Sequence, residues 1–208
     1  MALMVLDLID KYKLVSDQVD KTELRVILTE LEKALRKSDG NVVEFGCYAG
    51  TTSLFIRRVM DKLGSMGDFH VYDSFEGLPE KTNYDKSPVG ETFKAGALKF
   101  SKKNYIINFK KAGLKTPFIH KGWFSTLTQD DIPKNIIFAY LDGDYYDSIT
   151  GSLRMIWNDL LPEAVIVIDD YNSEALTGVK RAVDDWAIKH DFSLRSEKSL
   201  AILSLNKQ

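Results

Sequence analysis

A short apolar strand followed by a helix, with two glycines between them, is predicted at residues 42–53, Val42-Val43-Glu44-Phe45-Gly46-Cys47-Tyr48-Ala49-Gly50-Thr51-Thr52-Ser53. Glycines at such a turn let the backbone approach a ligand closely, and the free amide groups of the helix that follows can bind it. The glycine spacing is G-x-x-x-G, which differs from the G-x-G-x-x-G pattern of dinucleotide sites, and the lysine of a P-loop is missing. The stretch therefore indicates a ligand site of another kind, and its alternative is a tight strand-to-helix turn that binds nothing.

The alternation of strand and helix continues on the C-terminal side of this stretch. Further apolar segments of strand length lie at residues 69–72, 117–120, 136–141 and 165–168, mostly separated by segments of helix length. Such alternation predicts a parallel sheet with helices on both faces, and strands covered on both faces are continuously apolar. Residues 192–195 and 201–205, joined by 196–199, predict a hairpin at the end of the chain. The expected fold class is α/β, a Rossmann-like, mostly parallel sheet of seven strands.

On the N-terminal side, residues 1–40 carry apolar side chains at helical spacing. They include Leu24, Ile27, Leu28, Leu31 and Leu35. We expect leading helices here that pack on the core or form an oligomer contact, and one globular domain overall, with its main part over residues 41–208. Asp7 and Asp10 interrupt the apolar start, so a signal peptide is not expected. No uncharged apolar run approaches the roughly 20 residues that cross a bilayer, and the predicted location is cytoplasmic, without a membrane partner.

Composition and charge limit the function classes. The chain has 208 residues, of which 44% are hydrophobic, and its 28 Lys and Arg against 30 Asp and Glu leave a net charge of -2. This balance is typical of an ordinary globular protein and not of one that coats nucleic acid. Residues 93–121 contain eight lysines and no acid, but we interpret these lysines as the solvated face of helices and expect no nucleic-acid partner. Cys47 is the only cysteine, so no internal disulfide can form.

An acidic residue ends the second predicted strand. Asp73 follows Gly50 by twenty-three positions, and a carboxylate at that place can accept hydrogen bonds from two ribose hydroxyls. Together with the glycine turn, Asp73 indicates an adenosyl ligand.

Two later strands also end in carboxylates, and these predict a metal site. Asp142 follows the strand at residues 136–141, and Asp169 and Asp170 follow the strand at residues 165–168. Like charges packed together disfavour ionisation unless a cation compensates them, and carboxylate oxygens suit Mg²⁺ or another divalent cation. Asp144 lies close enough to Asp142 to reach the same site, whereas Asp147 is expected to cap the next helix.

The order of the motifs resembles the macrocin O-methyltransferase (TylF-like) family. The resemblance rests on residues 44–53, Tyr72-Asp73-Ser74-Phe75-Glu76-Gly77-Leu78-Pro79, Lys121-Gly122-Trp123-Phe124, Leu141-Asp142-Gly143-Asp144-Tyr145-Tyr146-Asp147-Ser148, Ile168-Asp169-Asp170-Tyr171 and residues 178–186. Members of that family are similar to catechol O-methyltransferases, and they use S-adenosylmethionine with a divalent metal to methylate hydroxyl groups, often on sugars of natural products. The resemblance implies the class I methyltransferase fold and a small-molecule hydroxyl acceptor, expected to be a sugar or a glycosylated natural product.

The resemblance also implies roles for individual residues. Residues expected to contact S-adenosylmethionine are Glu44, Gly46, Tyr48, Gly50, Thr52, Ser53, Asp73, Ser74, Gly122, Trp123, Phe124 and Asp142. Of these, Glu44, Gly46 and Gly50 would frame the methionine end. Asp73 would hold the ribose, and Trp123 with its neighbours would lie near the adenine. The expected metal ligands are Asp142, Asp169 and Asp170. Asp142 or Asp144 would act as the catalytic base, because none of the three histidines lies in a motif.

Two features depart from the family pattern. Residues 160–164 replace a usual Gly-Gly turn, and only about forty residues precede the first motif.

Two alternatives to the methyltransferase function stay open. Asp142-Gly143-Asp144 is a D-x-D motif, which in many glycosyltransferases holds a metal on a nucleotide sugar. A non-catalytic adenosyl-binding protein of the same fold is the other alternative. The amphipathic leading helices are consistent with a homodimer.

Overall fold

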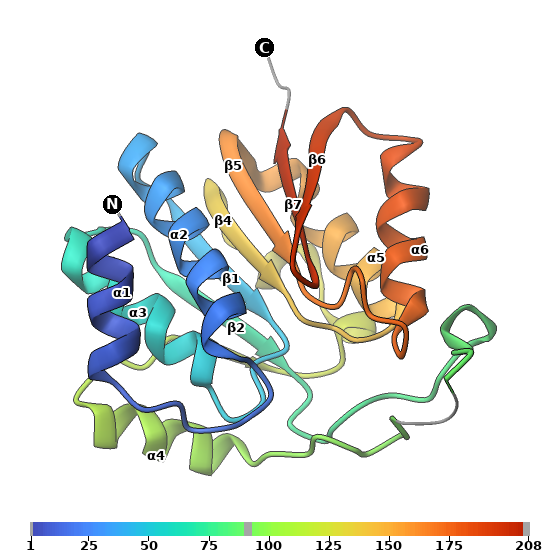
Figure 1. Cartoon of the computed structure of the whole chain (residues 1–208), viewed down its shortest axis with the longest axis horizontal. Coiled ribbons are helices and arrows are strands. Elements are labelled where there is room, and N and C mark those ends of the chain that lie inside the picture. The colour runs from blue at the N-terminus through green and yellow to red at the C-terminus, as the bar shows by residue number, and fades with distance from the viewer. Residues whose placement is uncertain (1, 90–92, 206–208) are drawn as a thin grey trace.

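The computed structural model describes residues 2–89 and 93–205 and contains a seven-stranded sheet in the order β3-β2-β1-β4-β5-β7-β6 (Figure 1). The strands are β1 (Asn41–Phe45), β2 (Phe69–Asp73), β3 (Phe118–Lys121), β4 (Ile136–Leu141), β5 (Leu160–Ile168), β6 (Phe192–Glu197) and β7 (Leu200–Leu205). Strands β1 to β5 pair in parallel, and β7 pairs antiparallel with both β5 and β6. The predicted mostly parallel sheet with an antiparallel C-terminal hairpin is confirmed.

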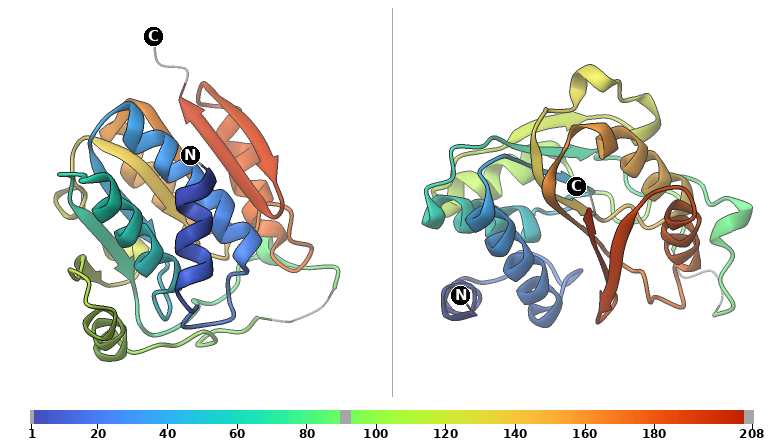
Figure 2. Two further views of the ribbon diagram at one scale, coloured as in Figure 1. Left: turned by 60° about the vertical axis from the view of Figure 1, so that its left-hand side comes forward. Right: turned by 90° about the horizontal axis from the view of Figure 1, so that it is seen from above.

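Helices cover both faces of this sheet (Figure 2). They are α1 (Ala2–Lys11), α2 (Lys21–Lys37), α3 (Thr51–Leu63), α4 (Lys102–Ala112), α5 (Tyr146–Ile156) and α6 (Thr177–Ala187), with 3-10 turns η1 (Asn83–Asp85), η2 (Phe124–Thr126), η3 (Gln129–Asp131) and η4 (Trp157–Asp159). Successive side chains of a strand point to opposite faces. Val42 of β1 accordingly packs with α1 to α4 in one core cluster, and Val43 packs with α5 and α6 in the other. Burial on both faces explains why these strands are apolar throughout.

The observed strand bounds differ from the expected ones mainly at β5. This strand begins at Leu160 and not at Val165, because Leu160 pairs with Ile136 while Val165 already pairs with Phe138. The intervening residues form a bulge that accommodates Pro162, which has no amide hydrogen to donate to the ladder. The C-terminal hairpin is also tighter than expected, since β6 ends at Glu197 and β7 starts at Leu200.

The parallel strands all end at the same edge of the sheet, which is where ligands bind in open α/β folds. The connections that follow β1, β2, β4 and β5 therefore meet there (Figure 1). Helix α2 shares the core with β4 and β5, and its first turn lies at the same edge. Within the described residues, no helix is both long and apolar enough to cross a membrane.

Candidate active site

The turn after β1 depends on the missing side chain of Gly46. Its φ angle is 83°, and a Cβ atom placed on it would lie 1.9 Å from the carbonyl oxygen of Asp142. The amide of Gly46 donates to the carbonyl of Tyr72, and the amide of Asp142 donates to the carbonyl of Phe45. Any side chain at residue 46 would separate these strand ends. The close approach places the backbone of Asp142, the first acidic residue after β4, directly against the glycine turn.

Asp73 ties the glycine turn to the end of β2. Its Oδ2 atom accepts hydrogen bonds from the amides of Cys47 at 2.8 Å and Tyr48 at 3.1 Å, and its Oδ1 atom accepts one from the amide of Phe75 at 2.7 Å. Amide donors of this kind hold a carboxylate in one orientation. Asp73 thus organises two loops and also lines the cavity between them.

Glu44 lies beneath the glycine turn and is 1% exposed. Ser53 of α3 donates a hydrogen bond to its Oε2 atom at 2.5 Å. Burial raises the pKa of Glu44 from 4.5 to about 8; the Ser53 hydrogen bond opposes this shift and the charge of Asp73 adds to it. Glu44 is therefore a protonated carboxylic acid at neutral pH in the ligand-free protein.

We expect Glu44→Gln to be more stable than the wild type by a margin that grows as pH rises from about 4.5 to about 8. Over this range the unfolded wild type releases the Glu44 proton and the folded protein keeps it, because the folded pKa is raised to about 8. The unfolding free energy of the wild type then falls with pH, by up to about 1.4 kcal/mol per unit, and glutamine has no proton to lose. Thermal melts at several pH values measure this margin.

Glu76→Gln is the control for this pH series. Glu76 is exposed, and hydrogen bonds from Lys99 and Lys121 lower its pKa. Its replacement should give no gain in stability with rising pH. A margin for Glu44→Gln that stays constant across the range would contradict a protonated Glu44.

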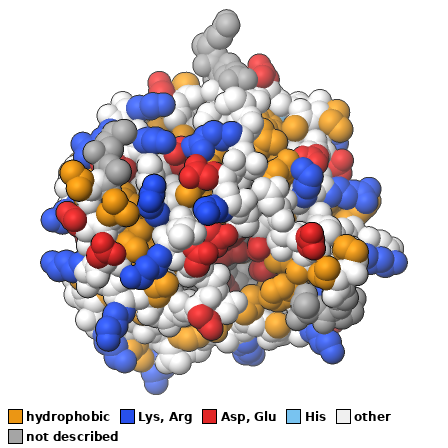
Figure 3. All heavy atoms as spheres, viewed as in Figure 1, with side chains coloured by type: hydrophobic (Ala, Val, Ile, Leu, Met, Phe, Trp, Pro, Cys, Tyr) orange, Lys and Arg blue, Asp and Glu red, His pale blue; other side chains and the backbone are white. Residues whose placement is uncertain are grey.

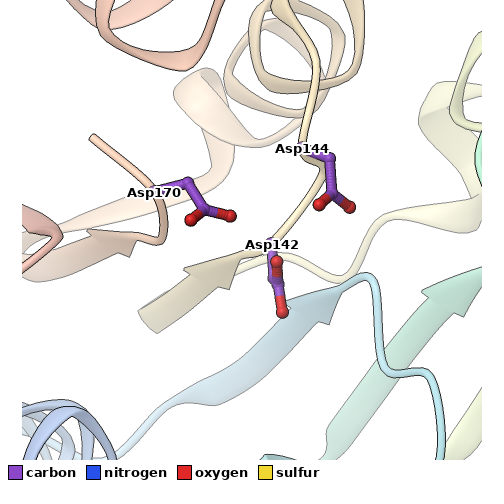
Figure 4. Close-up of side chains that lie close together, drawn as sticks. All are labelled: Asp142, Asp144 and Asp170. Atoms are coloured by element: carbon purple, nitrogen blue, oxygen red, sulfur yellow. The ribbon is translucent and has the colours of Figure 1, made fainter. Parts of the chain in front are cut away.

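Three carboxylates converge at the ends of β4 and β5 (Figure 4). Asp142, Asp144 and Asp170 each present an oxygen, and these oxygens lie within 4.8 Å of one another. Asp144 and Asp170 have positive φ angles of 59° and 58°, a backbone conformation that non-glycine residues adopt at some cost. We call these three residues the acid cluster. Asp144 joins it as its position in the loop after β4 led us to expect.

The acid cluster carries more negative charge than its surroundings neutralise. Burial raises the pKa of Asp142 well above its usual range, and its strongest charged neighbours are all carboxylates, namely Asp169, Asp144, Asp170 and Glu44. Burial, followed by the charge of Asp169, also raises the pKa of Asp144 to about 7 and that of Asp170 to about 8. A divalent cation with oxygen ligands would relieve this repulsion, so the donor set fits a hard metal ion.

Asp169 makes different contacts from the acid cluster. Its Oδ2 atom accepts a hydrogen bond from the buried Tyr140 hydroxyl at 2.5 Å, and its Oδ1 atom accepts one from the Asp170 amide at 2.8 Å. The Ser199 hydroxyl lies 3.3 Å from the same Oδ1 atom. Both carboxylate oxygens of Asp169 therefore have protein donors. The acid cluster contains Asp144 where the sequence led us to expect Asp169. Metal binding by Asp142, Asp169 and Asp170 together stays a prediction.

The acid cluster and the glycine turn open into one cavity of about 430 Å³. Figure 3 shows Asp and Glu side chains gathered around a hollow on this face. Of the residues expected to contact the cofactor, those that line the cavity are Gly46, Tyr48, Asp73, Ser74, Gly122, Trp123, Phe124 and Asp142. The others are not part of its wall; they are Glu44, Gly50, Thr52 and Ser53. Gly50 caps α3 with a φ angle of 87°, and Glu44 and Ser53 lie underneath the turn.

The structure adds wall residues that the sequence did not indicate. Gln18 and Glu23, around the start of α2, line the cavity, and Glu23 accepts a hydrogen bond from Ser199 of the β6–β7 turn at 2.5 Å. The remaining apolar wall comes from Leu78, Pro79, Phe93, Leu98, Ala175 and Leu176. Leu78 and Pro79 belong to the motif at residues 72–79, but no local sequence signal marks the others, because only the packing of distant segments brings them to the sheet edge.

Asp147 does not cap α5 as expected. Helix α5 starts at Tyr146, so Asp147 lies within its first turn and is exposed, and the N-cap residue Tyr145 makes no side-chain cap bond. An acidic side chain in the first turn still interacts favourably with the helix dipole. The expected capping role was wrong, because Asp147 lies two residues past the N-cap position, although its charge is at the favourable end of the helix.

The strand order and the carboxylates around a glycine turn define the class I methyltransferase fold. The chain belongs to the TylF family, because the model of that family, described as Macrocin-O-methyltransferase (TylF), matches residues 16–196. The family resemblance found from the motifs is thereby confirmed.

Two curated relatives are O-methyltransferases of Streptomyces. The chain is 30% identical over 161 residues to the 8-demethyl-8-(2,3-dimethoxy-alpha-L-rhamnosyl)-tetracenomycin-C 4'-O-methyltransferase of Streptomyces olivaceus. It is 24% identical over 169 residues to the demethyldecarbamoylnovobiocin O-methyltransferase of Streptomyces niveus. Each match covers 74% of this chain and 60% of the relative, so the chain spans less than two thirds of the length of these proteins.

Solved structures share the fold at low sequence identity. The O-methyltransferase NovP superposes with a TM-score of 0.75 at 19% identity, covering 88% of this chain and 79% of NovP. The calicheamicin methyltransferase CalS11 superposes with a TM-score of 0.74 at 15% identity, covering 99% of this chain and 91% of CalS11.

Proposed function

We propose that this protein is an S-adenosylmethionine-dependent, divalent-metal-assisted O-methyltransferase that acts on a hydroxyl of a sugar or a glycosylated natural product. The observation that carries the proposal is the single cavity shared by the glycine turn, Asp73 and the acid cluster. Membership of the TylF family supports methyl transfer. The name of the Streptomyces olivaceus relative, which includes a rhamnosyl group, supports a glycosylated acceptor.

The cofactor would be held at the glycine-turn end of the cavity. S-adenosylmethionine supplies an electrophilic methyl group. Gly46 lines the cavity and has no side chain, so the methionine part can approach its backbone. Asp73 borders the same space with a carboxylate already oriented by three amides. Trp123 is 38% exposed and lines the cavity, so its ring is available to contact an adenine. Four residues that were expected to contact the cofactor would instead support the glycine turn from outside the cavity; they are Glu44, Gly50, Thr52 and Ser53.

The acid cluster would hold the metal ion. A divalent cation acts as a Lewis acid that lowers the pKa of a bound hydroxyl and orients it. Tyr140 donates to Asp169 and lies 3.5 Å from Asp142, so its buried hydroxyl keeps two of the carboxylates in fixed positions.

A carboxylate of the cavity would take the proton of the acceptor hydroxyl, and Asp142 and Asp144 are both placed for this. The histidines are placed elsewhere in the described structure. The rings of His70 and His120 contact each other at 3.1 Å on β2 and β3, and His190 stacks on Trp186. Neither position borders the cavity.

Other parts of the chain have proposed roles as well. Residues 41–208 would form the methyltransferase domain, and residues 1–40 would cover one side of the acceptor cavity, since Gln18 and Glu23 line it. Homodimer formation through the leading helices stays a prediction. The glycosyltransferase alternative for Asp142-Gly143-Asp144 leaves the glycine turn and Asp170 without a role, and family membership favours methyl transfer.

Transfer of a labelled methyl group tests the proposal. Purified protein is incubated with S-adenosylmethionine labelled in its methyl group, Mg²⁺, and a panel of methyl glycosides, including the rhamnoside, together with catechol. We expect labelled product from at least one glycoside and almost none when a chelator removes the metal. Equal product with chelator would contradict metal assistance. Product from catechol but from no glycoside would contradict the proposed acceptor class.

A further inference from the structure

The connection between β2 and α4 forms one wall of the cavity. We call its described residues, 74–89 and 93–101, the strap. Figure 1 shows it leaving the sheet edge toward α6 and returning to α4. The strap contributes Ser74, Gly77, Leu78, Pro79, Phe93 and Leu98 to the cavity wall. Its two arms are joined by backbone hydrogen bonds from Leu78 to Ala97 at 2.8 Å and from Gly96 to Leu78 at 2.9 Å. These bonds hold the wall residues of the two arms together.

A buried carboxylate fastens the far part of the strap to α5. Asp85 is 1% exposed. Its Oδ2 atom accepts hydrogen bonds from the Thr82 amide at 2.9 Å and the Thr82 hydroxyl at 2.7 Å, which close the η1 turn. Its Oδ1 atom accepts a hydrogen bond from the amide of Tyr146, the first residue of α5, at 2.7 Å. A buried carboxylate is tolerated when donors surround it in this way.

The same carboxylate also reaches the start of α6. A Cβ atom placed on Gly178 would lie 2.0 Å from Oδ1 of Asp85 and 3.1 Å from the amide nitrogen of Tyr146. Asp85 is thus wedged between the first turns of both helices. The N-cap residues of α5 and α6, Tyr145 and Leu176, make no side-chain cap bond. Free amides at a helix start favour a negative charge, and here the strap supplies it.

Helices α5 and α6 begin directly after the loops that carry the acid cluster. Asp142 and Asp144 precede α5, and Asp170 precedes α6. Further bonds reinforce the strap along α6, because Thr177 donates to the carbonyl of Lys86 at 3.0 Å. The strap is thus joined to the starts of the two helices that follow the acidic loops, and Asp85 is the residue that contacts both helices.

We propose that Asp85 is a positioning residue, which sets the apolar wall of the strap against the acid cluster and thereby shapes the acceptor half of the cavity. The proposal rests on the proposed function only where it says that this half of the cavity binds the acceptor. The link between the strap and the two helices is independent of that function.

Asp85→Asn with Asp131→Asn as matched control tests this role. Asparagine has the size of aspartate, but its side-chain nitrogen is a hydrogen-bond donor. In place of one carboxylate oxygen it would face the donors of Thr82 or the amide of Tyr146, and those hydrogen bonds would be lost. Asp131 makes the same local capping bonds with Thr128, at 2.8 Å from the amide and 3.0 Å from the hydroxyl, in an exposed turn. Within the described structure the Asp131 carboxylate makes no hydrogen bond to α5 or α6, so the control removes an equal local motif without the interhelical contact of Asp85.

Gly178→Ala is an independent variant that leaves Asp85 in place. The φ angle of Gly178 is not in the left-handed region, so a helix accepts alanine there, and alanine favours helix formation. The new Cβ would displace the Asp85 carboxylate. We expect Gly178→Ala to reproduce the effects of Asp85→Asn, and the double variant to add little to either single one.

Three measurements decide the proposal. Hydrogen exchange of the backbone amides in the strap and at Tyr146 should become about tenfold faster in Asp85→Asn and Gly178→Ala. With the best glycoside of the panel, KM for the acceptor should rise about tenfold while kcat changes much less. The affinity for S-adenosylhomocysteine should stay within about twofold of the wild type, and Asp131→Asn should match the wild type throughout.

The outcomes separate the two proposals. Unchanged exchange and unchanged acceptor KM in both variants would overturn the role of Asp85. Faster exchange in both variants, together with no methyl transfer even by the wild type, would support the link between strap and helices and would contradict the proposed reaction instead. A cofactor affinity that falls as much as the acceptor affinity would overturn a role specific to the acceptor half.

Discussion

Replacement of Asp142 with alanine is expected to lower the rate of methyl transfer by about a thousandfold. Asp142 lies at the centre of the acid cluster and is surrounded by Asp144, Asp169 and Asp170. Its loss would remove one of the three carboxylates whose oxygens lie within 4.8 Å of one another and weaken the binding of the divalent ion. Metal assistance contributes several kcal/mol to a reaction of this type, and about 4 kcal/mol corresponds to a thousandfold change in rate.

Loss of function in Asp142→Ala can be separated from unfolding. Because its strongest charged neighbours are carboxylates, removal of Asp142 relieves repulsion in the metal-free protein. We therefore expect the variant to melt no lower than the wild type in chelator and to gain less stability from added Mg²⁺. Asp147→Ala, in the exposed first turn of α5, is the matched control and should keep normal turnover. Wild-type turnover by Asp142→Ala would contradict a metal site at the acid cluster.

Alanine at Gly46 should be the most disruptive small substitution in the site. Its Cβ atom would meet the Asp142 carbonyl oxygen at 1.9 Å, and the φ angle of 83° is itself unfavourable for alanine. Overpacking costs roughly 1–3 kcal/mol, and a left-handed conformation adds about 1–2 kcal/mol. We expect the free energy of unfolding to fall by about 3 kcal/mol or more. Because the glycine turn has to move, affinity for S-adenosylhomocysteine should fall as well.

Gly64→Ala is the matched control for this prediction. Gly64 caps the other end of α3 with a φ angle of 66°, and a Cβ atom placed on it would have nothing within 4 Å. Its replacement should cost only the conformational part, about 1–2 kcal/mol, with normal ligand binding. Denaturant unfolding curves and calorimetry compare the two variants. Equal losses of stability at the two glycines would contradict the close approach between Gly46 and Asp142.

Local patterns were sufficient to predict the sheet and the acidic residues at its edge. Continuous apolar runs marked the parallel strands because both faces of the sheet are covered. Carboxylates at the ends of parallel strands must meet at one edge, so Asp142 and Asp170 could be placed together from the sequence. The bulge at the start of β5 could not be predicted, since it depends on how that strand pairs with β4.

The finer structure of the site depends on tertiary contacts. The orientation of Asp169 follows from the buried hydroxyl of Tyr140 and from Ser199 in the distant hairpin turn. Asp85 belongs to none of the sequence motifs, and only its contact with Tyr146, sixty-one positions away, shows its connection to the helices. Such contacts carry no periodicity or spacing that a single sequence displays.

Calorimetric titration with S-adenosylhomocysteine in the presence of Mg²⁺ measures whether the cavity binds an adenosyl cofactor beside a divalent metal. We predict saturable one-to-one binding in the micromolar range, and affinity weakened at least about tenfold in Asp73→Ala, which loses a charged hydrogen-bonding partner. Folded wild-type protein that shows no binding of S-adenosylhomocysteine would contradict the assignment of this cavity to methyl transfer.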